Sequence, residues 1–81
     1  MAWVYILKGD RYYVGSTLAL INRLKDHRRG NTSTTRRIGN WRLVWQKEFF
    51  SLMQARNAEK KIKKWKSRKM IELLINGIID I

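Results

Sequence analysis

Residues 3–15 read WVYILKGDRYYVG, two runs of bulky apolar and aromatic residues separated by a short polar turn. Aromatic and β-branched side chains favour extended backbone, and Gly9 in the KGD turn can adopt the positive φ that tight hairpins need. We therefore predict antiparallel strands at residues 2–7 and 11–14, joined by a very short loop. The hairpin also carries the three tyrosines of the chain, Tyr5, Tyr12 and Tyr13.

The middle of the chain predicts a helix followed by a third strand. Thr17 is expected to cap a helix that begins at Leu18 and stops at Gly30. Residues 41–50, WRLVWQKEFF, place apolar side chains at alternating positions, and their other face is also fairly apolar. This pattern is typical of a central strand that is covered on both sides.

The last third of the chain predicts two helices. Ser51 and Gln54 form a capping box at the start of a helix that runs to about Lys66. Ser67 is expected to cap the final helix, which ends at residues 76–77, an Asn-Gly pair. The order of elements is therefore strand, strand, helix, strand, helix, helix. It predicts an α+β fold with a small antiparallel sheet and helices packed on it.

Length and composition narrow the class of protein. A chain of 81 residues is expected to form a single domain over residues 1–81. The absence of cysteine excludes a disulfide scaffold and a cysteine-based zinc site. No apolar run is long enough to span a membrane. The N-terminus, MAWVYILKGD, has no positive leader before its apolar run, so a cytoplasmic location is expected.

The charge balance points to a polyanionic partner. Eighteen Lys and Arg residues stand against six Asp and Glu residues, which gives a net charge of +12. Such a field favours nucleic acid, with an anionic membrane surface as the competing partner. Charge alone does not distinguish binding from cleavage.

One acidic residue lies among apolar ones on the helix that follows Ser51. At about 100° per residue, the apolar side chains of this helix share one arc of roughly 140°. They are Leu52, Ala55, Ala58, Ile62 and Trp65. Glu59 falls inside the arc, where a carboxylate is costly unless it is paired. Two interpretations stay open: an ion pair with a nearby cation, or a ligand of Mg²⁺, which often uses one or two carboxylates plus substrate phosphate.

The first predicted helix supplies two further candidates. Arg23 and His27 are four residues apart and share a helix face. Each alone is typical of a solvated helix residue. Together with Glu59 and the tyrosines, they form a set of groups suited to phosphodiester cleavage. An arginine can bind phosphate, a cation can polarise it, and a phenol or imidazole can take a proton from water.

These motifs resemble the GIY-YIG nuclease superfamily, particularly its small single-domain bacterial members. The first motif is WVY at residues 3–5 and the second is YVG at residues 13–15. LINRLKDH is similar to the first helix of that subgroup, and RLVWQKEF and ARNAEKKIKKW are similar to its third strand and Glu-bearing helix. The resemblance covers about residues 2–70. Trp3 stands where the family motif has glycine, and the hairpin loop is shorter than in typical members.

The resemblance implies a role for each motif residue. Tyr5 is expected to be the general base that activates water, and Tyr13 to position the water or the phosphate. Gly15 is expected to permit a close approach of the backbone at the strand end. The resemblance also implies the family fold, a three-stranded antiparallel sheet flanked by helices.

The helix residues receive the remaining roles. The resemblance implies that Arg23 contacts the scissile phosphate, that His27 assists nearby, and that Glu59 binds one divalent cation, Mg²⁺ or Mn²⁺. An unperturbed phenol has a pKa of about 10 and an imidazole one of about 6.5, so the residues alone favour His27 as base. The resemblance favours Tyr5.

A basic surface is expected to hold the substrate. Phosphate contacts of this kind position a nucleic acid without reading its bases. The candidates are Arg28, Arg29, Arg36, Arg37, Lys60, Lys63 and Lys64. The leading hypothesis is a metal-dependent DNA endonuclease, structure-selective or weakly sequence-specific. The alternatives are a non-catalytic module that binds DNA or RNA, and a basic RNA-binding protein of ribosomal type.

Overall fold

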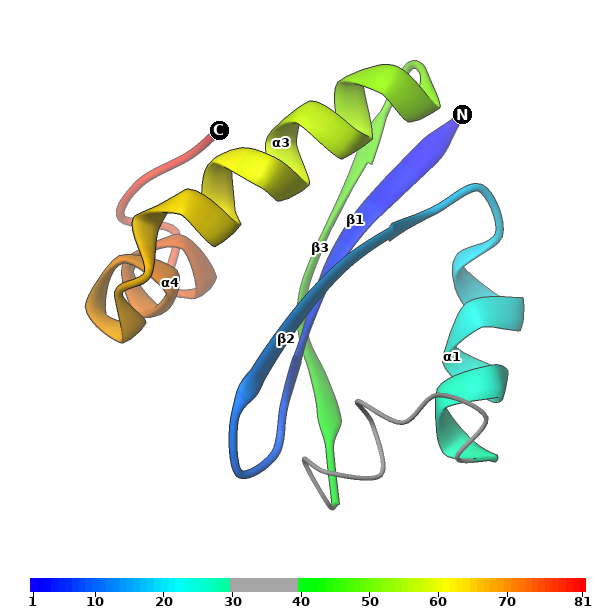
Figure 1. Cartoon of the computed structure of the whole chain (residues 1–81), viewed down its shortest axis with the longest axis horizontal. Coiled ribbons are helices and arrows are strands. Elements are labelled where there is room, and N and C mark those ends of the chain that lie inside the picture. Colours follow the sequence, from blue (N-terminus) through cyan, green and yellow to red (C-terminus); the bar gives the residue numbers. More distant parts are fainter. Residues whose placement is uncertain (30–39) are drawn as a thin grey trace.

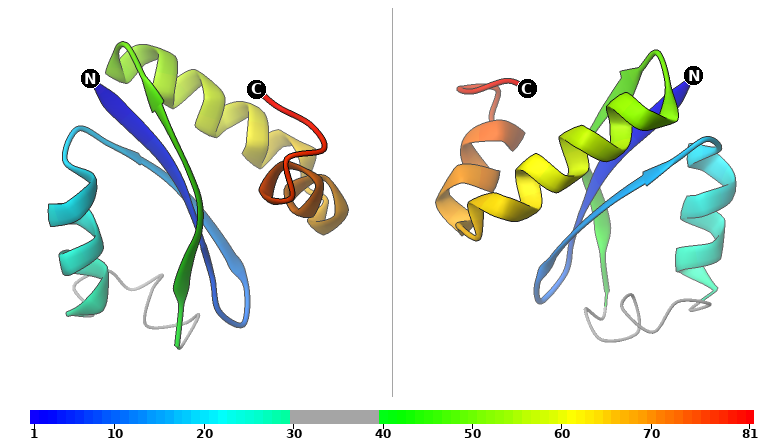
Figure 2. Two further views of the ribbon diagram at one scale, coloured as in Figure 1. Left: turned by 180° about the vertical axis from the view of Figure 1, so that it is seen from behind. Right: turned by 45° about the horizontal axis from the view of Figure 1, so that its top comes forward.

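A three-stranded antiparallel sheet separates the helices into two layers (Figure 1). The computed structural model describes residues 1–29 and 40–81. The elements are β1 (Ala2–Lys8), β2 (Tyr12–Thr17), α1 (Leu20–Arg28), β3 (Arg42–Phe49), α3 (Leu52–Trp65) and α4 (Arg68–Ile75). Helix α1 covers one face of the sheet, and α3 and α4 lie on the other (Figure 2). The α+β fold and the predicted order of elements are confirmed.

The first strand, β1, is the centre of the sheet. The strand order is β2-β1-β3, and both neighbours are antiparallel to β1. Four consecutive residues of β1, Val4 to Leu7, have no exposed surface. The prediction that residues 41–50 form the central strand is therefore wrong, because β3 is an edge strand.

An irregularity in the β1–β3 pairing explains why β3 is apolar on both faces. Ile6 pairs with Trp45 and Leu7 with Leu43, which leaves Val44 as an extra residue between them. A bulge of this kind reverses the alternation of side chains along a strand. Leu43 consequently packs on the α1 side, whereas Val44 and Trp45 pack on the α3 side.

The hairpin between β1 and β2 closes without a left-handed glycine. The backbone N–H of Gly9 donates to the carbonyl of Arg11 at 3.0 Å. Among the described residues, positive φ occurs only at Lys66 and Gly77, so the predicted positive φ at Gly9 is wrong. Strand β2 also continues to Thr17, beyond the predicted end, and this extension places the motif glycine inside the sheet.

The predicted caps of the last two helices are confirmed. Ser51 accepts a hydrogen bond from the backbone N–H of Gln54 at 3.2 Å, and Ser67 accepts one from Met70 at 3.4 Å. Helix α4 ends at residues 76–77, where Gly77 takes a φ of 75°. These signals are local, because each depends on residues within one helical turn.

Helix α1 begins later than predicted. Thr17 remains in β2, and its hydroxyl accepts a hydrogen bond from the backbone N–H of Ala19 at 3.1 Å. The helix then starts at Leu20, with Ala19 at the cap position and no side-chain cap. The predicted stop at Gly30 lies outside the described residues.

Each face of the sheet has its own apolar core. On the α3 side, the buried residues are Ala2, Val4, Ile6, Val14, Ala55, Ala58, Ile62 and Leu74. On the α1 side, Tyr5 and Leu7 are buried against partly exposed residues of α1 and β3. No helix in the described part of the chain has the length and apolar character needed to cross a bilayer.

Candidate active site

Tyr5 is held in the centre of the sheet by its partner on β2. It pairs with Gly15 across the β1–β2 ladder, and its side chain is fully buried. A Cβ atom on Gly15 would lie 2.5 Å from the hydroxyl oxygen of Tyr5 and 2.7 Å from its Cζ. The close approach at Gly15 is thus made by the phenol of Tyr5, which needs the space that a side chain would fill.

The hydroxyl of Tyr5 meets the imidazole of His27. The Tyr5 oxygen and His27 Nε2 are 2.9 Å apart in a buried hydrogen bond, although the two residues lie 22 positions apart in the chain. His27 comes from α1 and is only 1% exposed. The structure therefore brings together the two residues that the sequence offered as competing bases.

Tyr13 and Arg23 complete this cluster on its outer side. The ring of Tyr13 lies 5.2 Å from that of His27 and 6.2 Å from that of Tyr5, between ring centroids. Both Tyr13 and Arg23 are partly exposed. They are the members of the cluster that a bound substrate can reach from solvent.

The surroundings shift the pKa values of the buried pair in opposite directions. Burial raises the pKa of Tyr5 to about 12, against the opposing effect of the Arg23 guanidinium. Burial lowers the pKa of His27, and the positive charge of Arg23 lowers it further, while Asp26 opposes both. The interaction with Tyr5 raises the pKa of Arg23. At neutral pH the phenol is protonated and the imidazole is neutral, which suits proton transfer from one to the other.

Trp41 supports His27 from a position that the sequence did not single out. The two rings are 6.0 Å apart in an edge-on arrangement, and the Arg28 guanidinium lies 4.8 Å from the centre of the Trp41 ring. The alternation of apolar residues marked Trp41 as a core residue only. Nothing in the spacing of these residues shows that Trp41, which comes just before β3, lies against α1.

Glu59 approaches β2 from the opposite side of the sheet. Its Oε1 accepts a hydrogen bond from Ser16 at 2.5 Å, and its Oε2 forms an ion pair with Lys63 at 2.6 Å. The side chain is 19% exposed, so it lies at the margin of the core, as its position in the apolar arc of the helix predicted. Because neighbouring residues of a strand point to opposite faces, Gly15 faces Tyr5 whereas Ser16 faces Glu59.

The residues around Glu59 fit a magnesium-type cation better than a closed metal cage. The described part of the chain contains no group of three His, Cys, Asp or Glu side chains that could hold a metal. A single carboxylate with a neighbouring hydroxyl matches the way Mg²⁺ is held, through one carboxylate, waters and substrate phosphate. The ion pair with Lys63 confirms that Glu59 has a cationic partner, and a metal ion would have to compete with that ammonium group.

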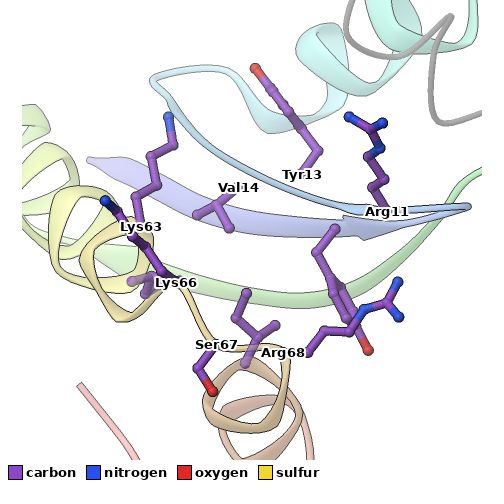
Figure 3. Close-up of a pocket in the computed structure, with 10 residues that line it drawn as sticks. Arg11, Tyr13, Val14, Lys63, Lys66, Ser67 and Arg68 are labelled. Carbon is purple, nitrogen blue, oxygen red and sulfur yellow. The ribbon is translucent and has the colours of Figure 1, made fainter.

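The residues predicted to contact phosphate are all exposed where the structure describes them. Those on the surface of the described residues are Arg28, Arg29, Lys60, Lys63 and Lys64. Arg36 and Arg37 lie outside the described residues. Sequence reasoning missed Arg11 and Arg68, which line a hollow together with Lys63 and Lys66 (Figure 3). Their proximity arises because the β1–β2 turn lies next to the junction of α3 and α4, a contact that has no local sequence signal.

Comparison with protein families identifies one region of similarity in the chain. Residues 1–72 match the family model described as the GIY-YIG catalytic domain. The match covers all the candidate catalytic residues on both sides of β2 and most of α4. Comparisons with curated proteins and with solved structures give no match.

Proposed function

Because the chain belongs to the GIY-YIG family, a family of nucleases, we propose that it is a metal-dependent DNA endonuclease that hydrolyses phosphodiester bonds. The observation that carries the proposal is the buried hydrogen bond between Tyr5 and His27, with Tyr13 and Arg23 on its exposed side. We take residues 1–81 to act as one domain. A small domain of this kind suits structure-selective or weakly sequence-specific cutting.

Arg23 and Tyr13 are assigned the binding of the substrate phosphate and the positioning of water. A guanidinium can form two parallel hydrogen bonds to a phosphate, and it stabilises the negative charge that builds up on the phosphoryl oxygens during attack. Tyr13 lies beside Arg23 at the same opening, where its hydroxyl can orient the attacking water. Their partial exposure supports these roles.

Tyr5 and His27 are assigned the removal of a proton from the attacking water. With a pKa of about 12, only about one Tyr5 in 10⁵ is ionised at pH 7, so the phenol alone is a poor base. The neutral imidazole removes this difficulty: as the phenol oxygen takes a proton from water, the phenolic proton passes to His27 Nε2. The hydroxide so formed attacks phosphorus, and the bond to the leaving oxygen breaks. The two residues thus act together as the general base.

Glu59 and Ser16 are assigned to the divalent cation, Mg²⁺ or Mn²⁺. When bound, such an ion lowers the pKa of coordinated water and stabilises charge on phosphoryl oxygens. The carboxylate of Glu59 supplies the protein ligand, and the hydroxyl of Ser16 orients that carboxylate. Lys63 neutralises it in the absence of the ion.

Cleavage of nicked and branched DNA, with and without Mg²⁺ or Mn²⁺, tests the proposal. We expect Tyr5→Phe and Glu59→Gln to lower the rate by about 100-fold or more while DNA binding persists. Glu72→Gln makes the same chemical change at an exposed position of α4 and should cut like the wild type. Unchanged metal-dependent cutting by Glu59→Gln would show that the cation site is wrong. Binding without cutting under every condition would favour the non-catalytic module.

A further inference from the structure

A cationic hollow lies beside the candidate active site, between β2 and the junction of α3 and α4 (Figure 3). It has a volume of about 380 Å³ and an apolar floor that includes Val14, Ile62 and Ile71. Four basic residues from three parts of the chain line it: Arg11, Lys63, Lys66 and Arg68. In Figure 3, Lys63 and Lys66 come from the α3 end of the hollow and Arg68 from the start of α4, whereas Arg11 borders the hollow and points, like Tyr13, toward the α1 side of the sheet.

Most of this positive charge has no acidic partner. Within residues 1–29 and 40–81, the ion pairs are Lys47–Asp80 and Lys63–Glu59. Arg11, Lys66 and Arg68 therefore have no carboxylate partner in the described part of the chain. Like charges gathered around one hollow repel one another, and a polyanion relieves that repulsion.

The backbone at Lys66 is unusual for a lysine. Its φ of 47° lies in the left-handed region, and it is the one non-glycine residue with positive φ in the part of the chain that the structure describes. The position ends α3, where glycine is the usual residue because it adopts this conformation without strain. A lysine here places its side chain at the margin of the hollow at some conformational cost.

Arg68 is oriented toward the hollow by two contacts. Its Nη2 donates to the backbone carbonyl of Asp10 at 3.3 Å, and its guanidinium lies 5.9 Å from the centre of the Tyr12 ring. These contacts connect the start of α4 to the β1–β2 turn. They hold the charge in place while leaving the guanidinium without an acidic partner.

We propose that this hollow binds the sugar–phosphate backbone of a nucleic-acid strand next to the bond that is cut, an inference that rests on the proposed function. Two residues connect the hollow to the active site. Tyr13 borders the hollow while its ring packs against His27 on the α1 side of the sheet, and Lys63 lines the hollow and also pairs with Glu59. The strand then runs along the outer edge of β2, from Tyr13 toward the β1–β2 turn. The hollow contacts phosphates and reads no base.

Salt-dependent binding of labelled nicked DNA, measured by fluorescence anisotropy in EDTA, tests the hollow without cleavage. Each lost phosphate contact should make the negative slope of log affinity against log salt less steep by about 0.7 to 0.9. We expect a change in slope equal to one phosphate contact for Lys66→Gly, and about two contacts for the double variant Arg11→Gln/Arg68→Gln. The matched control, Arg42→Gln/Lys61→Gln, removes two exposed charges outside the hollow and should keep nearly the wild-type slope.

Stability measurements separate lost charge from lost structure. Lys66→Gly suits the left-handed backbone, so its thermal midpoint should stay equal to the wild-type value or rise while its DNA affinity falls. If the double variant unfolds, Arg68→Lys retains the charge without the guanidinium contacts and should keep the wild-type slope. Unchanged slopes in Lys66→Gly and in the folded double variant would overturn the proposal that the hollow binds nucleic acid.

The outcomes also separate the hollow from the proposed function. A wild-type protein that binds no nucleic acid would refute both. If the wild-type protein cuts DNA but the variants keep the wild-type salt slope, the proposed role of the hollow is refuted and the proposed function is not. Vesicles of anionic lipid give a further comparison. If the protein binds them more tightly than DNA, and Lys66→Gly weakens that binding, the same charges belong to a membrane-binding surface and the proposal is overturned.

Discussion

Gly15 and Tyr5 depend on each other at the level of single residues. Gly15→Ala would place a methyl group 2.5 Å from the Tyr5 hydroxyl and 2.7 Å from its ring, and a ring buried in the central strand cannot move aside easily. We expect a loss of about 1–3 kcal/mol in the free energy of unfolding, together with loss of the hydrogen bond to His27. Urea denaturation measures the first effect and the cleavage rate the second.

A double-mutant cycle with Tyr5→Ala controls this prediction. If the methyl group acts through the phenol, Gly15→Ala should cost much less when the ring has been removed, so the two changes will not be additive. Equal costs in both backgrounds would show that Gly15 matters for another reason, such as the backbone of β2.

His27 should make activity and stability depend on acid in the same direction. Its pKa is lowered by burial and by Arg23, so the unfolded chain binds the proton more readily than the folded one. The stabilisation is complete above the ordinary pKa of about 6.5, and it is lost as the pH falls toward the lowered value in the folded state. Protonation also removes the acceptor at Nε2, so the cleavage rate should fall over the same range.

Thermal midpoints and cleavage rates of the wild type and His27→Gln, measured from pH 8 downward, test this dependence. The wild type should lose stability below about pH 6.5, and the part due to His27 should be absent in the variant. An acid limb of the rate profile above pH 6.5 would contradict a lowered pKa at His27 and point to another group.

At the scale of elements, the helices start where local chemistry predicts when their caps are free to act. Ser51 and Ser67 each lie just before a helix, and each accepts the expected backbone hydrogen bond. Thr17 has the same chemistry, but it is the last residue of β2. Pairing with Trp3 across the sheet keeps Thr17 extended, so the helix begins only at Leu20.

The face of α3 that carries Glu59 joins the core to the cation site. Lys63 is four residues further along the same helix, and its ammonium group forms an ion pair with Oε2 of that carboxylate. Lys63→Met should therefore tighten Mn²⁺ binding by about two- to fivefold, because partly exposed ion pairs are worth up to about 1 kcal/mol. Titration of free Mn²⁺ by electron paramagnetic resonance measures this without nucleic acid.

Two variants control the Lys63 prediction. Lys61→Met removes the same charge from an exposed position of α3, and it reports the general effect of one fewer cation. Glu59→Gln should lose the Mn²⁺ binding. If Lys63→Met and Lys61→Met bind Mn²⁺ equally, Lys63 does not compete with the ion.

At the scale of the whole molecule, a small core carries a large share of the stability. Ile62 is fully buried where α3 packs on the sheet, and it also forms part of the floor of the hollow. Ile62→Ala should lower the free energy of unfolding by about 2–5 kcal/mol, against a total of about 5–15 kcal/mol for a domain. Chemical denaturation measures the loss, and Lys61→Ala, the exposed neighbour, should change stability by less than about 0.5 kcal/mol. A loss near zero for Ile62→Ala would contradict this packing.

The molecule places its candidate catalytic groups on both sides of one edge strand. Tyr5, Tyr13 and His27 lie on the α1 side of β2, while Glu59 reaches β2 from the α3 side. Between them lies the outer edge of β2, along which the proposed path of the nucleic-acid strand runs. The same arrangement brings the hollow next to Tyr13.

The sequence by itself determined the features that depend on near neighbours. The hairpin, the caps at Ser51 and Ser67, the inward side of α3 and the end of α4 each follow from residues within a few positions of one another. The family motifs at residues 3–5 and 13–15 also belong to this group, because they are short and local. Backbone hydrogen bonds, caps and periodicity are short-range effects, and the sequence shows them directly.

Only the tertiary structure decided which of these elements meet. The position of β1 at the centre of the sheet, the bulge opposite Ile6 and Leu7, and the bond between Tyr5 and His27 all join distant parts of the chain. Such contacts are set by how side chains fill the space between layers, and residue spacing carries no direct record of that packing. The sequence therefore named candidate bases, while the packing of α1 on the sheet joined Tyr5 and His27 into one pair.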